Sequence, residues 1–261
     1  MAYTTIDDPT AYFQTKTYTG SAGAQSITFD GNSDLQPDWI WIKERGATGG
    51  HVVTDTVRGI SASSAPFLQP SATGAEIDGN GTVANRTLTS SNTNGFTLGQ
   101  DAYYTNFNNN SDTYVSWNWK AGTSFTNDAS ATSVGTIDSA GSVSDTSGFS
   151  IVTYTAAGAA ATIKHGLSSA PKMIFTRKLN GSPNWGVYYG DPTDYLELNT
   201  TAATQDDANM WNDTAPTSSV FSVGGDNKSS GGGNYVAYCF AEKKGYSKFG
   251  TYTGNDDDDG A

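Results

Sequence analysis

Short runs of alternating apolar and polar residues recur along the chain, and residues that favour turns separate them. Residues 27–29 (ITF), 96–98 (FTL) and 173–177 (MIFTR) are rich in β-branched and aromatic side chains, which favour strands. Residues 39–43 (WIWIK) are apolar on both faces, as expected of a central strand in a covered sheet. Turn signals recur about every 8–12 residues, the spacing of a sandwich or barrel. The pattern predicts an all-β chain without a long helix.

One run raises the question of which face of a strand is buried. In residues 112–122 (DTYVSWNWKAG), Trp117 and Trp119 share one face of the predicted strand and Ser116 lies on the other. The tryptophans could stack on a sugar or could line the core of a sandwich. We favour the core and expect Trp39, Trp117 and Trp119 to be mostly buried.

The same landmarks occur twice in the same order. A Thr-Tyr-Thr triplet precedes a Pro-led apolar run, then a GF or VF strand, then a YV-aromatic strand; Tyr18 and Tyr114 mark the first copy, and Tyr154 and Tyr235 the second. This order predicts an internal duplication. The longer first copy carries an insertion, which we place at residues 58–92.

The landmarks divide the chain into five parts. Two related β-sandwich or jelly-roll units, lectin-like in architecture, are expected, with short edge strands at both chain ends. The predicted parts are an N-terminal arm (1–12), the first sandwich (13–122), a Ser/Thr/Gly-rich linker or exposed meander (123–148), the second sandwich (149–245), and a C-terminal strand with an acidic tail (246–261).

Composition and charge narrow the class of protein. Only 15% of the residues are charged and the net charge is −12, which disfavours binding to nucleic acid or to an anionic membrane. No apolar run reaches the length of a membrane span. We expect no secretory signal, and Cys239 is the single cysteine, so no intrachain disulfide can form. A virion protein, made in the host cytoplasm and released by lysis, fits these features together.

Aromatic side chains in turn-rich segments are the candidates for contact with a ligand or partner, because binding residues concentrate on loops. Packing within the fold is the competing interpretation. The candidates are Tyr103, Tyr104, Phe107, Trp185, Tyr188 and Tyr189.

The sequence indicates no catalytic, cofactor-binding or metal-binding residue. His51 and Asp55 would lie about 13 Å apart on a strand at ~3.3 Å per residue, too far for a catalytic dyad. The run Asp256–Asp259 is typical of a solvated tail. Residues 30–34 (DGNSD) and 78–82 (DGNGT) resemble short calcium loops but are also ordinary turns.

The strings FQTKTYTG, PDWIWIK, GFTLG, DTYVSWNWKAG, HGLSSAPKMI and NYVAYCFAEKKGYSKFGTYTGN resemble a repeat family of tailed phages that infect marine bacteria and cyanobacteria. Members are described as virion or tail-fibre-like proteins of uncharacterised role. The resemblance covers nearly the whole chain. It implies a virion location and supplies no catalytic motif.

We therefore expect a non-enzymatic virion structural protein, tail or fibre associated, that docks on other virion proteins. A glycan- or host-receptor-binding module and a capsid decoration (cement) protein are the alternatives, and a glycan hydrolase is the weakest. We expect a homo-oligomer, a trimer by analogy with phage fibres, in which both chain ends contact adjacent subunits.

Overall fold

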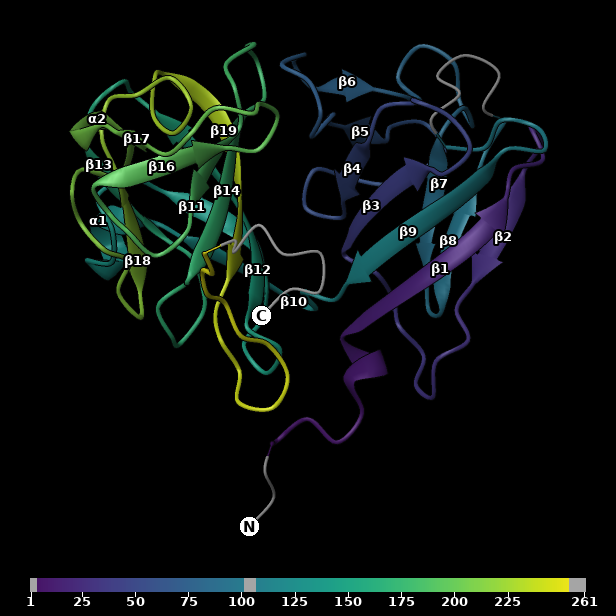
Figure 1. Ribbon diagram of the computed structural model, residues 1–261, viewed down its shortest axis with the longest axis horizontal. Coiled ribbons are helices and arrows are strands. Elements are labelled where there is room, and N and C mark those ends of the chain that lie inside the picture. Colours follow the sequence, from purple (N-terminus) through teal and green to yellow (C-terminus); the bar gives the residue numbers. More distant parts are fainter. Residues whose placement is uncertain (1–3, 101–106, 254–261) are drawn as a thin grey trace.

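The computed structural model describes residues 4–100 and 107–253. Two β-rich units lie side by side, and the chain completes the first before it enters the second (Figure 1). The first unit contains η1 (Pro9–Ala11), β1 (Phe13–Thr19), β2 (Gln25–Thr28), β3 (Trp39–Glu44), β4 (Val52–Asp55), β5 (Pro66–Phe67), β6 (Ile77–Asp78), β7 (Leu88–Asn92), β8 (Gly95–Leu98) and β9 (Thr113–Trp119).

The second unit contains β10 (Thr123–Asn127), α1 (Ala129–Thr132), β11 (Ser139–Ser144), β12 (Phe149–Ala156), β13 (Ala161–Lys164), β14 (Met173–Lys178), β15 (Gly186–Tyr188), β16 (Asp194–Glu197), β17 (Gln205–Asp206), α2 (Ala208–Trp211), β18 (Val220–Val223) and β19 (Gly233–Phe240). The pairings between these strands are antiparallel. This architecture confirms the predicted all-β sandwich class.

Two sheets enclose the core of the first unit. One has the strand order β1-β9-β3-β4 and the other β2-β8-β7. Ile40 and Ile42 of β3 meet Phe96 and Leu98 of β8 in a fully buried cluster. Alternation along β3 places these residues inside and Trp39 and Trp41 outside, so the larger sheet has apolar side chains on both faces.

The second unit is built on an eight-stranded sheet of order β10-β11-β12-β19-β14-β15-β16-β17, and the β13-β18 pair covers it. Its core contains Val152, Ile174, Phe221 and Trp211. β19 lies at the centre of this sheet, between β12 and β14, and seven of its eight residues are buried or half-buried on both faces.

Corresponding strands pair in the same way in the two units. Tyr18 of β1 is opposite Tyr114 of β9, and Tyr154 of β12 is opposite Tyr235 of β19. The rings stack in both pairs, with centroids 5.1 and 5.4 Å apart. β3 and β14 then pair with the other edge of the same central strands. Shared pairing is what a duplication would produce, and the common origin of the halves stays a prediction.

One landmark glycine has a clear structural reason in each unit. Gly99 ends the GFTLG string and Gly224 ends VFSVG. A Cβ on Gly99 would lie 2.0 Å from the carbonyl oxygen of Asn85, and one on Gly224 would lie 2.2 Å from that of Asn209. Only glycine permits this close approach of two backbones.

The segment expected as a linker or exposed meander, residues 123–148, is part of the second sheet. β10 pairs with β11, and β11 pairs with β12, so the segment is the meander rather than the linker. The strand β10 is largely exposed and therefore carries polar side chains, so its sequence lacks the apolar alternation by which a strand is recognised. The chain therefore passes directly from β9 into the second unit within three residues.

The chain ends differ from the expected edge strands. The described part of the N-terminal arm lies on its own chain: Ile6 is buried, and the Asp8 carboxylate accepts hydrogen bonds from the hydroxyl groups of Ser33 (2.6 Å) and Thr10 (2.7 Å). The Tyr12 ring lies 6.4 Å from that of Tyr246, in the segment after β19. At the other end, residues 251–253 form no strand, and Tyr252 is 95% exposed. None of the helices in the described parts of the chain has the length and apolarity required to cross a bilayer.

Candidate functional site

The outer face of the first unit's larger sheet carries a row of aromatic side chains. Phe13 of β1, Trp119 of β9 and Trp39 of β3 are opposite one another across three paired strands. The ring centroids of Phe13 and Trp119 are 4.6 Å apart, as are those of Trp119 and Trp39. Alternation along each strand places this row on the side away from the unit's own core.

The second unit presents a matching row from its eight-stranded sheet. Phe149, Phe240 and Met173 are opposite one another on β12, β19 and β14. Trp39 contacts this sheet directly, with its ring 5.5 Å from Phe149 and 4.8 Å from Tyr238. We call the contact between the two outer faces the seam. Its buried residues form a third core cluster, separate from the cores of the two units.

The seam changes the place expected for the tryptophans, from the core of the first unit to the outer face of its larger sheet. Trp39 is buried there, and Trp117 and Trp119 are partly buried. The side of β9 that faces its own core carries Tyr114, Ser116 and Asn118. The Nδ2 of Asn118 donates to the Gln14 backbone carbonyl (3.0 Å) and to Ser116 Oγ (2.9 Å), while its Oδ1 accepts no hydrogen bond from the described residues.

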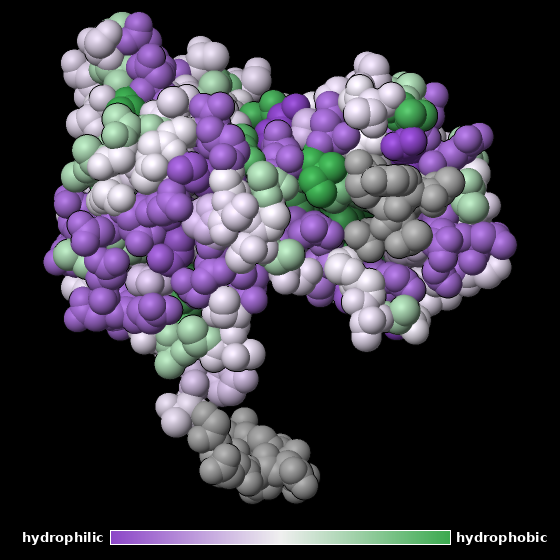
Figure 2. Space-filling view, turned by 90° about the horizontal axis from the view of Figure 1, so that it is seen from above, coloured by the Kyte–Doolittle hydropathy of each residue, from purple (hydrophilic) through white to green (hydrophobic). Residues whose placement is uncertain are grey.

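The two faces do not close completely, and a pocket of about 310 Å³ remains at the edge of the seam. We call it the wedge pocket. The residues that line it come from both units and from the segment after β19: Trp39, Trp41, Trp119, Ser147, Gly148, Phe149, Met173, Phe175, Phe240, Ala241, Tyr246, Ser247 and Phe249. The lining is almost wholly apolar and aromatic, which is the usual character of a ligand or docking pocket. Seen from above, the upper side of the junction between the two lobes also carries hydrophobic residues, within a largely hydrophilic surface (Figure 2).

The segment 242–249 covers one side of the wedge pocket. The backbone N–H of Lys243 donates to the Ser247 carbonyl (3.1 Å), and the N–H of Phe249 donates to the Glu242 carboxylate (3.1 Å). The Phe249 ring lies 6.2 Å from that of Phe240. On this side, a tight turn of the same chain forms the wall of the pocket.

A buried ionic network crosses the seam beside the aromatic rows. Arg58 Nε donates to Asp55 Oδ2 (2.6 Å) and Nη1 donates to Glu76 Oε2 (2.8 Å). The hydroxyl of Tyr238, from the second unit, donates to Asp55 Oδ2 (2.8 Å) and accepts from Arg58 Nη2 (3.1 Å). Burial raises the pKa of Tyr238 well above its ordinary value, so this hydroxyl stays protonated.

The charge of Arg58 is retained in this buried place. Burial alone would lower the pKa of its guanidinium, but Asp55, Tyr238 and Glu76 together raise it above the ordinary value. Asp55 is completely buried and both partners of the pair are held by hydrogen bonds. Loss of either would leave an uncompensated charge in the seam, which is strongly destabilising.

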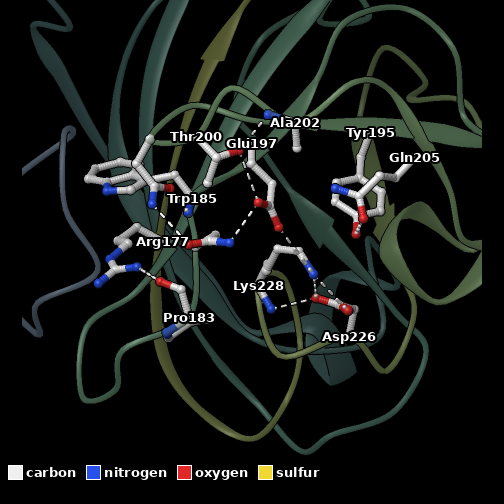
Figure 3. Close-up of polar contacts among 12 residues, drawn as sticks. Arg177, Pro183, Trp185, Tyr195, Glu197, Thr200, Ala202, Gln205, Asp226 and Lys228 are labelled. Carbon is white, nitrogen blue, oxygen red and sulfur yellow. Dashed lines mark hydrogen bonds and ion pairs between the residues drawn. The ribbon is translucent and has the colours of Figure 1, made fainter.

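A second arginine links the units through carbonyl groups. The guanidinium of Arg177, on β14, donates to the backbone carbonyls of Thr73 (2.6 Å) and Gly74 (2.5 Å) in the first unit and to that of Pro183 in its own. It also lies 5.6 Å from the centre of the Trp185 ring (Figure 3). Burial lowers the pKa of Arg177 to about 10, so it remains charged at neutral pH.

A polar cluster near β16 joins three loops of the second unit (Figure 3). Glu197 Oε2 accepts from Asn184 Nδ2 (2.6 Å), and Lys228 Nζ lies 3.1 Å from Asp226 Oδ2 and 3.9 Å from Glu197 Oε1. Burial would lower the pKa of Lys228, but Asp226 raises it above its ordinary value. Lys228 also stands over the Tyr195 ring at 4.7 Å. Since each charge has an opposite partner, the cluster acts as a brace for these loops.

The structure places the predicted ligand candidates mostly inside the fold. Phe107, Trp185 and Tyr188 are buried, and Trp185 Nε1 donates to the Gln69 carbonyl across the seam (3.1 Å). Tyr189 is half-buried and its hydroxyl donates to Asp194 Oδ2 (3.3 Å). Tyr103 and Tyr104 lie outside the described residues. Packing is the role that the structure gives the three buried aromatics, and Tyr189 keeps an accessible surface.

The histidines serve the fold. His51 Nδ1 accepts from Trp41 Nε1 (2.8 Å), and the buried His165 lies 3.1 Å from the Thr217 carbonyl and accepts from the Leu167 N–H. Burial lowers the pKa of His165 to about 4, so its ring is neutral at pH 7. Within residues 4–100 and 107–253, no group of three His, Cys, Asp or Glu side chains is arranged to hold a metal ion.

The sequence patterns do not identify either seam arginine as a buried contact. One signal was available: Met173, Phe175 and Arg177 alternate on one face of β14, so a charge follows two apolar side chains onto the same surface. A charge in such a row indicates either a sheet edge or a buried partner. Arg58 follows its partner Asp55 by three residues, but this spacing does not show that the pair is buried, because the other partners, Glu76 and Tyr238, are distant in sequence.

No curated protein and no solved structure matches this sequence. A family model does match, over residues 8–261, which include both units and the seam between them. The chain therefore belongs to the family described as a domain of unknown function (DUF7483).

Proposed function

We propose that the chain is a non-enzymatic structural protein of a bacteriophage virion, tail or fibre associated, which assembles with copies of itself and docks on other virion proteins. The observation that carries the proposal is the seam. An apolar core and two buried arginines join the units, so the chain is built as one rigid body of two sandwiches rather than as two modules on a flexible linker.

Rigidity of this kind suits a component that transmits force or holds spacing in a particle. Inter-domain contacts within a chain are usually polar and permit relative motion. Here the contact is aromatic, Arg58 is paired with carboxylates, Arg177 donates to backbone carbonyls, and only three residues separate β9 from β10. The phage assignment rests on the resemblance in sequence, and the wedge pocket offers an apolar surface for docking.

The test is to locate the chain in purified particles of a phage that encodes it. Tryptic peptides should appear in the particles at the stoichiometry of a structural protein, and an electron-microscopy map should place two linked sandwiches in the tail or fibres. Density on the capsid shell would select the decoration alternative. Recovery of the chain only in the particle-free lysate would contradict the proposal.

Glycan or receptor recognition is the second candidate, and a polar groove favours it. An open groove of about 620 Å³ crosses β10, β11, β12 and β19, and side chains that can bond sugar hydroxyls line it: Thr126, Asp128, Asp138, Thr153, Thr155 and Asn234. A glycan array with the full chain tests this candidate. Binding that is lost in Asp138→Asn and retained in the exposed-site control Val83→Ala would support recognition through the groove.

A further inference from the structure

Tyr252 is an aromatic side chain with almost no contact in its own chain. It is 95% exposed, and only one other large hydrophobic residue in the described chain is exposed, Val83 at 49%. Tyrosine is among the side chains that contribute most to protein interfaces. An isolated tyrosine on an extended segment is therefore a candidate anchor for a partner.

The wedge pocket has the size and lining to accept such an anchor. Its volume of about 310 Å³ is at the lower end of the ~300–1,000 Å³ range of ligand pockets. Its aromatic walls, among them Trp41, Phe175 and Phe249, can contact a ring by edge or by face. Tyr252 does not occupy the pocket of its own chain, because it is exposed to solvent.

Charge around the two features is complementary. Tyr252 is followed in the sequence by four consecutive aspartates, Asp256–Asp259. Lys172 and Lys248 are exposed, and each adjoins a pocket-lining residue in the sequence, Met173 and Phe249 respectively. These two lysines outnumber Glu242, whose carboxylate accepts from the Phe249 N–H, so an acidic peptide would meet a net positive charge there, although the chain as a whole has a net charge of −12.

We propose that Tyr252 of one copy inserts into the wedge pocket of a second copy, with the aspartates beside its lysines. The contact joins two different surfaces and is heterologous, so repetition closes a ring or extends a filament. The proposal rests on the self-assembly part of the proposed function and names the surfaces that perform it.

The test compares full-length variants by sedimentation velocity over a range of concentrations. Tyr252→Ala removes the anchor, and Met173→Glu places a negative charge in the pocket. Each should weaken self-association by about tenfold or more, as loss of a hot-spot residue does. Val83→Ala removes the other exposed hydrophobic side chain and should leave association unchanged. High salt should weaken the wild-type contact, since the aspartate–lysine attraction is screened.

Mixing the two defective variants gives the sharpest result. Tyr252→Ala retains a working pocket and Met173→Glu retains the anchor, so an equimolar mixture should form dimers and no larger species. Should Met173→Glu fail to fold, a synthetic peptide of residues 250–261 replaces it. That peptide should dissociate wild-type oligomers, and the same peptide with Tyr252→Ala should require about tenfold more.

Three results would overturn the proposal. They are a wild-type chain that stays monomeric at its highest soluble concentration, a Tyr252→Ala oligomer as strong as wild type, and a mixture without dimers. If the chain oligomerises equally well without Tyr252, self-assembly occurs through another surface and that part of the proposed function is retained. The virion location is tested separately on particles and does not depend on these outcomes.

Discussion

The two seam arginines show how single residues determine whether a buried charge is tolerated. Arg58 is matched by carboxylates and a tyrosine hydroxyl, and its pKa is raised. Arg177 donates only to carbonyl oxygens and lies beside an aromatic ring, and burial lowers its pKa to about 10. Both remain charged at neutral pH, but Arg177 depends on backbone atoms of the first unit that no side-chain substitution can replace.

His165 makes stability depend on pH. Its folded pKa of about 4 lies below the ordinary value of 6.5, so the unfolded chain binds the proton first. Its contribution is therefore complete above pH 6.5 and is lost as the pH falls from 6.5 to 4, by up to about 3 kcal/mol. Urea unfolding of wild type and His165→Asn across this window should show a steeper decline in wild type. Parallel curves would contradict the assignment.

Among the elements, the central strands β9 and β19 determine the architecture. Each pairs with two neighbours, and each places one face against its own core and the other against the seam. Their aromatic side chains thus serve two cores. This double burial explains why β19 is a nearly continuous apolar and aromatic run, whereas β9 keeps Ser116 and Asn118 on the face toward its own core.

The tryptophans of β9 provide a matched pair of substitutions. Trp119 lies against Phe13, Trp39 and Phe149, so Trp119→Ala should lower the free energy of unfolding by about 3 kcal/mol. Among the described residues, the Trp117 ring contacts only that of Trp41, with the centroids 6.4 Å apart, and Trp117→Ala should lower the free energy of unfolding by about 1 kcal/mol. Urea unfolding of both variants tests the order. An equal loss of stability in the two variants, or a larger loss for Trp117→Ala, would mean that the seam contacts of Trp119 do not stabilise the fold.

These strands also show what the sequence can and cannot predict. The positions of the strands follow from local patterns, and the repeated landmarks mark Tyr18 and Tyr114 in one unit and Tyr154 and Tyr235 in the other, but that the two tyrosines of each unit are opposite one another is seen only in the structure. The face assignment of Trp117 and Trp119 does not follow from the sequence either, because a period of two separates the faces of a strand without saying what covers each. The seam and the wedge pocket depend on contacts between residues more than a hundred positions apart.

At the scale of the molecule, the seam predicts that both units unfold together. Calorimetry of the full chain should show one transition, because separation would expose a shared aromatic core and the Arg58 network. Arg58→Gln leaves Asp55 buried without its partner, which costs about 3–5 kcal/mol, and should broaden or split the transition. Lys16→Gln removes an exposed ion pair with Asp30 and should leave its shape unchanged.

Two resolved transitions in the wild-type chain would contradict this prediction, since they would show that the seam does not couple the units. If Arg58→Gln lowers the temperature of a single transition without broadening it, the network stabilises the chain but is not needed to couple the two units. Either result is read directly from the ratio of calorimetric to van't Hoff enthalpy.

The order of strands along the chain has a consequence during synthesis. β9 completes the first unit's larger sheet at Trp119, but the partners of its outer aromatic row include Tyr238 and Phe240, at the end of β19. At about 5–20 residues per second, a ribosome needs on the order of ten seconds to add the intervening residues. Throughout that interval the nascent chain carries a finished sandwich with a bare tryptophan face, which chaperones would recognise and which neighbouring nascent chains could contact.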